Sequence, residues 1–129
     1  MQRRNQAYSD QSTALISIAS NASLATFAHT TGTMPDSRRF RINIITHADK
    51  AFSETDMIGR TYHCGDALLM IQKPVGRCAA INVDPETAQR SDQDYVRFMR
   101  AKFGHSNLGV FAKVTNGGKV EVGDVLRPS

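Results

Sequence analysis

The chain has 129 residues, enough for one hydrophobic core and too few for two ordinary domains. Its hydrophobic content of 40% and charged content of 22% are globular values and argue against disorder. A net charge of +4 fits either an anionic ligand or solvated surface charge, and the absence of tryptophan and of a long basic run argues against a nucleic-acid partner.

No apolar stretch is long enough for a signal peptide or a membrane span. We therefore expect a cytoplasmic protein without a membrane partner. Two cysteines, Cys64 and Cys78, are too few for a disulfide framework or a four-cysteine zinc site.

The first third of the chain predicts a strand, a helix and a loop. Residues 13–18 form an apolar run typical of a buried strand. Ser20 is an expected N-cap for a helix over residues 21–29, whose apolar side chains recur at three- and four-residue spacing. Residues 30–37 contain glycine and proline and are expected to form a loop.

An alternating strand is predicted next, over residues 40–46. In this pattern Arg41 and Asn43 lie on the face opposite the apolar one, which is either a solvent face or a binding face. Residues 48–59, with Glu54 and Asp56, are expected to form an irregular acidic linker.

The rest of the chain predicts short strands around one further helix. The helix is expected over residues 93–103, with Asp92 as its N-cap and Gly104 as its end. Turn signals at residues 65–66, 84–87 and 116–118 separate the strands. The expected strands cover residues 60–64, 67–71, 78–83, 108–114 and 119–122, with a short pairing at 125–126. About seven strands with two peripheral helices favour a mainly β fold, a closed or nearly closed β-barrel.

The most informative residue is Cys78, which follows a Pro/Gly turn and the basic residue Arg77. A turn presents a side chain at the surface, and a neighbouring guanidinium favours the thiolate, which is both nucleophile and metal ligand. The alternative is a core cysteine, since free cysteine is often buried. We expect Cys64 to be the core cysteine. A zinc site formed by His63, Cys64, Cys78 and His105 is disfavoured. His63 and Cys64 are neighbours on an expected strand, so their side chains point to opposite faces of the sheet.

An ordered set of short motifs resembles the MOSC domain, the carboxy-terminal domain of molybdenum cofactor sulfurases. The motifs are Tyr8-Ser9-Asp10, Phe40-Arg41-Ile42-Asn43-Ile44, Ile58-Gly59-Arg60, Gly65-Asp66, Gly76-Arg77-Cys78, Val83-Asp84-Pro85-Glu86-Thr87 and Val122-Gly123-Asp124. Within that superfamily the Arg-Cys pair followed by the Val-Asp-Pro turn is most similar to the amidoxime-reducing components. The resemblance implies a single domain over residues 1–129 without the amino-terminal β domain of larger relatives.

The resemblance also implies the site. Cys78 would be the molybdenum ligand and the catalytic residue of a pyranopterin molybdenum cofactor. The expected cofactor-binding residues are Asp10, Ser12, Arg41, Asn43, Gly76 and Arg77. Phe111 lies where relatives carry a pocket aromatic, although a place in the barrel core is favoured. Pyridoxal phosphate is not expected, because the aminotransferase-like domain that binds it has no counterpart here.

The function implied is part of an oxidoreductase that reduces small N-oxygenated compounds. Whether the chain is itself an enzyme stays open, because activity would depend on a separate amino-terminal domain or an electron-donor protein. Two alternatives remain: a sulfur-carrier or cofactor-delivery module with a persulfide on Cys78, and an inactive stand-alone barrel.

Overall fold

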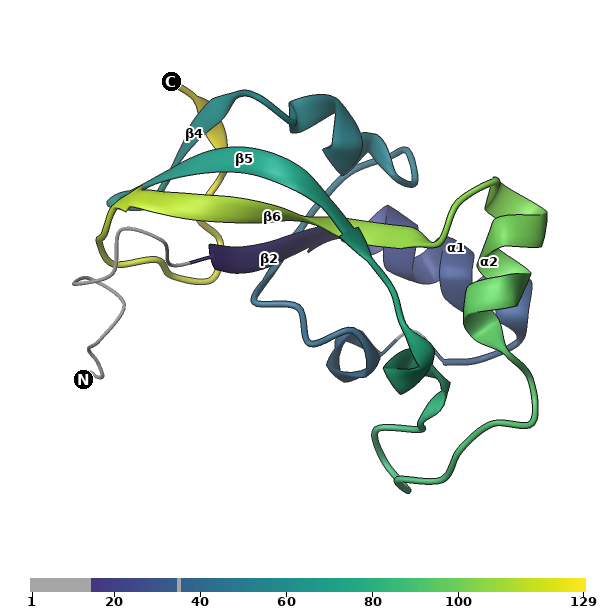
Figure 1. The fold of residues 1–129 in the computed structure, drawn as a ribbon. Coiled ribbons are helices and arrows are strands. Elements are labelled where there is room, and N and C mark those ends of the chain that lie inside the picture. The colour runs from purple at the N-terminus through teal and green to yellow at the C-terminus, as the bar shows by residue number, and fades with distance from the viewer. Residues whose placement is uncertain (1–14, 35) are drawn as a thin grey trace.

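The computed structural model describes residues 15–34 and 36–129. Six strands form one curled sheet, an open half-barrel, in the order β3-β2-β6-β5-β4-β7 (Figure 1). The strands are β2 (Leu15–Ser20), β3 (Ile44–Thr46), β4 (Thr61–Cys64), β5 (Ala67–Gly76), β6 (Asn107–Asn116) and β7 (Arg127–Pro128). The fold is mainly β, as the sequence predicts. The expectation of a closed or nearly closed barrel of about seven strands is wrong for the described residues, whose sheet is open and has six strands, because residues 78–83 and 119–122 form no strand.

Two helices lie together at one end of the sheet (Figure 1). The first, α1 (Asn21–Thr31), begins where Ser23 N–H donates to the side chain of Ser20 and ends at Gly32, which has a left-handed φ of 74°. The N-cap prediction is confirmed. The second, α2 (Tyr95–Phe103), is capped by Asp94 and not by Asp92, and it ends at Gly104 as predicted. Neither helix is long and apolar enough to cross a membrane.

The strand expected over residues 40–46 is reduced to β3. The preceding residues form a 3-10 helix, η2 (Ser37–Arg39), and Arg41 has a φ of 53°, which an extended strand cannot accommodate. The chain becomes extended only at Ile44, where β3 pairs in parallel with β2.

The strand expected over residues 78–83 is also wrong. These residues form a 3-10 helix, η4 (Ala79–Asn82), in which Ile81 and Asn82 are buried. The carbonyl oxygen of Ile81 accepts a hydrogen bond from the Arg39 side chain instead of from a neighbouring strand.

Residues 119–122 form no strand, whereas the segment expected to be an irregular linker contains a helical turn. The carbonyl of Lys119 accepts a hydrogen bond of 2.9 Å from Asp66 N–H, so this segment packs on the 65–66 turn and adds no strand. The linker contains a 3-10 helix, η3 (Ser53–Met57), in which Glu54 is only 2% exposed.

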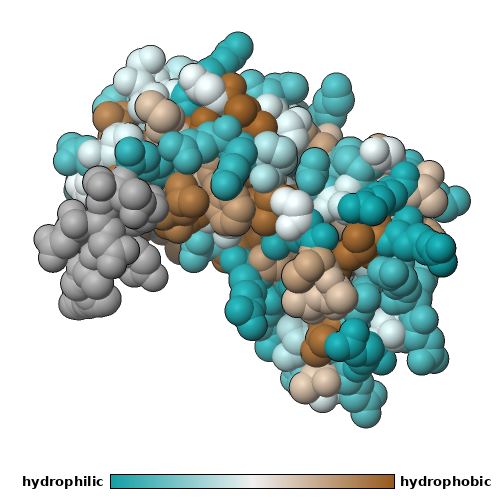
Figure 2. Space-filling model, viewed as in Figure 1, coloured by the Kyte–Doolittle hydropathy of each residue, from teal (hydrophilic) through white to brown (hydrophobic). Residues whose placement is uncertain are grey.

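Two apolar clusters make up the core. One fills the inside of the curled sheet and includes Ile18, Leu69, Ile71 and Val110. The other joins the sheet to the helices: the Phe27 ring meets Phe40 and Tyr95 edge to face, with centroids 4.9 and 5.6 Å apart. Figure 2 shows a mainly hydrophilic surface in this view, with apolar residues in separate groups. The second cluster fixes the segments that surround the candidate site.

Candidate functional site

Strand β5 ends at Gly76, so Cys78 lies just beyond its carboxy-terminal end. Its pairing with β6 shifts register between Ile71 and Lys73 and again between Pro74 and Gly76, so the strand bends near its end. Cys78 follows this bend and is exposed, whereas Cys64 is only 2% exposed. The structure thus buries Cys64, as expected, and presents Cys78, for which the sequence had left a core position open.

Cys78 lies at the wall of a cavity of about 600 Å³. The lining residues come from β2, from η2 and the turn after it, from β5 and the residues that follow it, from η4 and the turn after it, and from β6. Among the predicted site residues, the cavity brings together Arg41, Asn43, Gly76, Arg77 and Cys78. Asp10 and Ser12 lie outside the described residues.

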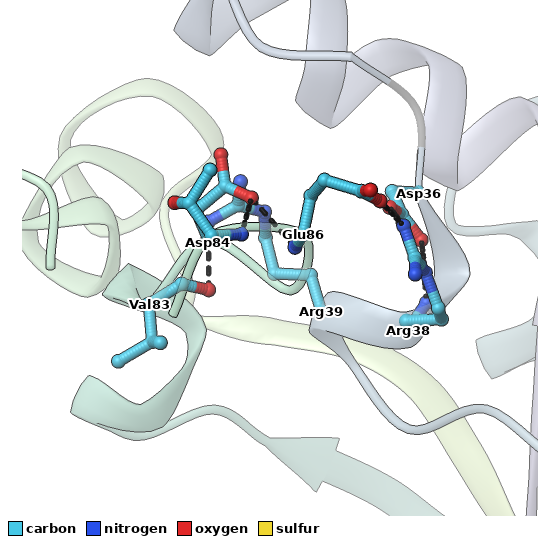
Figure 3. A network of polar contacts seen from close by, with 7 residues as sticks. Asp36, Arg38, Arg39, Val83, Asp84 and Glu86 are labelled. Carbon is cyan, nitrogen blue, oxygen red and sulfur yellow. Dashed lines mark hydrogen bonds and ion pairs between the residues drawn. The ribbon is translucent and has the colours of Figure 1, made fainter. Parts of the chain in front are cut away.

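The charge of this cavity has one sign. Four arginines line it, namely Arg38, Arg39, Arg41 and Arg77, and no aspartate or glutamate among residues 15–34 and 36–129 does so. Arg38 is also paired with Asp36 and Glu86 at 2.7 and 2.8 Å (Figure 3). A concave surface on which positive charges outnumber negative ones attracts anionic ligands, even with Arg38 partly neutralised by its two partners.

The Arg77 side chain binds backbone carbonyl groups next to the site. Its guanidinium donates to the carbonyl of Leu108 at 2.6 and 3.0 Å and to that of Phe40 at 2.8 Å. Burial lowers the pKa of Arg77 to about 10, and the charge of Cys78 acts in the opposite direction by raising it. Arg77 is therefore charged at neutral pH, and its donors hold backbone carbonyls in place.

Arg41 and Asn43 reach the cavity by a different geometry from the predicted one. They do not leave one face of a strand, because both precede β3 and Arg41 has a left-handed backbone. The Asn43 carboxamide oxygen accepts from the Ser17 backbone N–H at 2.8 Å, and the Arg41 carbonyl accepts from the Ser17 hydroxyl at 3.0 Å. Strained backbone of this kind clusters at functional sites.

The sequence favoured the wrong place for one cavity residue and missed another. Phe111, for which the barrel core was favoured over the pocket, lines the cavity, with Lys73 Nζ 5.7 Å from its ring centroid. Arg39 also lines it, and its buried Nε has no hydrogen-bond partner in the part of the chain that the structure describes. The only signal for Arg39 was its place in a cluster of arginines.

Across residues 15–34 and 36–129, no group of three metal-ligating side chains comes together.

The two thiols differ in expected reactivity. Under native conditions iodoacetamide should alkylate Cys78 at least about tenfold faster than Cys64, since burial and the Asp124 charge raise the pKa of the Cys64 thiol. Peptide mapping by mass spectrometry would measure both rates. A Cys78→Ser variant should lose the fast reaction, and equal rates at the two sulfurs would contradict the placement of Cys78.

Comparison with known proteins gives a family and a fold. The sequence model of the MOSC domain matches residues 5–127. Among solved structures, the chain is similar to YiiM from Geobacillus stearothermophilus, with a TM-score of 0.67 and 16% identity over 88% of this chain and 53% of the other. The chain thus spans about half the length of that protein. No curated protein matches.

Proposed function

The chain belongs to the MOSC domain family, and from this premise we propose that it binds a pyranopterin molybdenum cofactor with the Cys78 sulfur as a metal ligand. The family is associated with this cofactor. The observation that carries the proposal is the exposed Cys78 thiol at the wall of a cavity to which the described residues contribute four arginines and no carboxylate.

The residues present fit such a group on chemical grounds. A thiolate is a soft ligand suited to a polarisable metal centre. The pterin carries an anionic phosphate, for which arginine is the preferred partner because its planar guanidinium donates two hydrogen bonds at once. The buried Nε of Arg39 adds a donor that has no acceptor among the described residues.

Each residue would have a separate role in holding the group. Cys78 would donate its sulfur to the metal, and the exposed Arg41 would bind the anionic part of the cofactor. Gly76 leaves room at the cavity wall: a Cβ placed there would have one neighbour within 4 Å, the Asn107 side chain at 3.7 Å. Arg77 would keep the Cys78 segment in place through its bonds to Phe40 and Leu108. When bound, the cofactor supplies two-electron redox chemistry.

The finer part of the proposal concerns substrate and branch. We place the chain with the amidoxime-reducing components, as part of an oxidoreductase that reduces small N-oxygenated compounds. Support comes from the turn after η4, where the Asp84 carboxylate accepts from the backbone N–H of Glu86 and of Thr87, while Val83 and Pro85 line the cavity. An electron-donor protein or a separate amino-terminal domain belongs to this proposal.

The first test is metal content. Protein made in a host that synthesises the cofactor, and purified without oxygen, should contain molybdenum, and the Cys78→Ala variant should lose nearly all of it. Cys64→Ala is the matched control, because it removes the buried thiol and should leave the metal-to-protein ratio unchanged. Equal molybdenum in wild type and Cys78→Ala would refute the proposal.

The same preparations separate the alternatives. Reduction of an amidoxime with a reduced viologen as electron donor tests the oxidoreductase assignment. Sulfane sulfur on Cys78 without molybdenum, detected by mass spectrometry, would favour the sulfur-carrier function. A folded protein with neither molybdenum nor sulfane sulfur would be the inactive domain.

A further inference from the structure

The placement of Cys78 depends on the short 3-10 helix that follows it. Cys78 is the N-cap of η4, and its carbonyl accepts from Ile81 N–H at 3.2 Å. The second bond of this turn runs from Val83 N–H to the Ala80 carbonyl at 3.3 Å. A single 3-10 turn has poor hydrogen-bond geometry and little stability alone. Contacts from elsewhere must therefore fix η4 and, with it, the cysteine.

Arg39 supplies such contacts at the far end of η4. Its Nη1 donates to the Ile81 carbonyl at 2.7 Å. The same nitrogen lies 3.4 Å from the Val83 carbonyl (Figure 3). Its guanidinium carbon lies 5.4 Å from the ring centroid of the buried Tyr95, the first residue of α2. Charged donors make stronger hydrogen bonds than neutral ones. Arg39 thus ties η4 to the helix layer.

The two sides of Cys78 are held from one place in the chain. On the amino-terminal side, Arg77 donates to the carbonyl of Phe40, the residue after Arg39. On the carboxy-terminal side, Arg39 holds the end of η4. The turn formed by η2 and Phe40 therefore fixes the segment that carries the thiol from both directions.

Stability alone does not account for the conformation of Arg39. Its buried Nε has no acceptor within the described residues, and an unmade bond of this kind costs about 1–3 kcal/mol. Arg39 also lines a second cavity of about 600 Å³, beside the one that contains Cys78. Its side chain therefore forms part of the wall between the two cavities while it holds η4.

We propose that Arg39 is the positioning residue of this site: by holding the Ile81 and Val83 carbonyls, it sets where the Cys78 sulfur lies in the cavity. The inference rests on the proposed role of Cys78 as metal ligand. Outer residues that orient a metal ligand characteristically change metal affinity without touching the metal.

The test uses Arg39→Met, which keeps an unbranched apolar stem and removes the donors. Hydrogen exchange at the Ile81 and Val83 amides should rise at least about tenfold, because their bonds define η4. Molybdenum affinity should fall about 10-fold or more. Arg97→Met, an exposed residue on α2 outside both cavities, removes the same charge and should change neither quantity.

A conservative variant keeps the test decisive. Arg39→Lys retains one charged donor and should give exchange and metal content between those of wild type and Arg39→Met. Unchanged exchange at Ile81 and Val83 in both variants would overturn the proposal, and so would a rise shared equally by the whole sheet. If Arg39→Met does not fold, wild-type exchange in Arg39→Lys would overturn it.

The two proposals fail in distinguishable ways. Wild-type protein without molybdenum would refute the cofactor assignment. The hydrogen-exchange measurement at Ile81 and Val83 would still test whether Arg39 holds η4. In that case the positioning of the sulfur is measured by the alkylation rate of Cys78, which should change at least about threefold in Arg39→Met and stay constant in Arg97→Met. A constant rate in both would overturn the role of Arg39.

Discussion

Replacing Glu54 by alanine is expected to lower the free energy of unfolding by about 3 kcal/mol, because it leaves two buried donors without an acceptor. The Glu54 carboxylate accepts from the Ser20 backbone N–H and, at 2.6 Å, from the Ser23 hydroxyl. All three residues are buried. The carboxylate also lies at the amino-terminal end of α1, where the helix dipole favours negative charge.

Urea unfolding followed by circular dichroism would measure this effect. Asp56→Ala is the matched control: Asp56 lies in the same 3-10 helix but is exposed, so its loss should change stability by less than about 0.5 kcal/mol. Glu54→Gln should fall between the two, since an amide offers one acceptor oxygen where the carboxylate offers two. Equal stability of Glu54→Ala and Asp56→Ala would show that the network does not stabilise the fold.

Replacing Arg77 by methionine should also cost about 3 kcal/mol, since hydrogen bonds to a charged group contribute more than neutral ones and their loss strands the acceptors. Three bonds would disappear, two to the Leu108 carbonyl and one to the Phe40 carbonyl. The guanidinium also lies over the Phe40 ring, with its carbon 5.2 Å from the centroid. Methionine keeps the apolar stem but none of these donors.

The same unfolding experiment applies, with Arg60→Met as the control because Arg60 is exposed just before β4. Arg77→Lys should recover part of the loss, as one ammonium group cannot match the fork of the guanidinium. If Arg77→Met were as stable as Arg60→Met, the bonds to Leu108 and Phe40 would not be structural.

The parts of the fold that the sequence predicted are those with local signals. Ser20 is followed by a helical apolar pattern, and its side chain does cap α1. Gly104 ends α2 because glycine takes the left-handed conformation readily. Strand β4 was predicted from its alternating pattern and β5 from its apolar composition, with the turn at residues 65–66 between them.

The errors lie where distant contacts decide the local structure. Residues 78–83 form a short apolar run, and periodicity alone does not separate a strand from a buried turn in so few residues. Here the side chain of Arg39, which is distant in the sequence, binds the carbonyl of Ile81 and favours the 3-10 turn over a strand. Glu54 looked like a linker residue because nothing near it in sequence shows that Ser20 and Ser23 would bury it.

The candidate site was partly predictable for a similar reason. A cysteine after a Pro/Gly turn carries its own signal of exposure, and Cys78 is exposed. Arg41 and Asn43 do line the cavity, but through a turn with a left-handed residue and not through the face of a strand. The part played by Arg39 needed the fold, since its partners lie in η4 and α2.

The pairing of β2 with β6 joins segments far apart in the sequence, for example Leu15 with Lys113. The cavity around Cys78 takes walls from both of these strands and from the segments between them. Closing so long a loop carries a large entropic cost before any contact repays it. The cavity should therefore appear only with the final, cooperative folding step, and a proteolytic fragment that lacks either strand would carry the thiol without its surroundings.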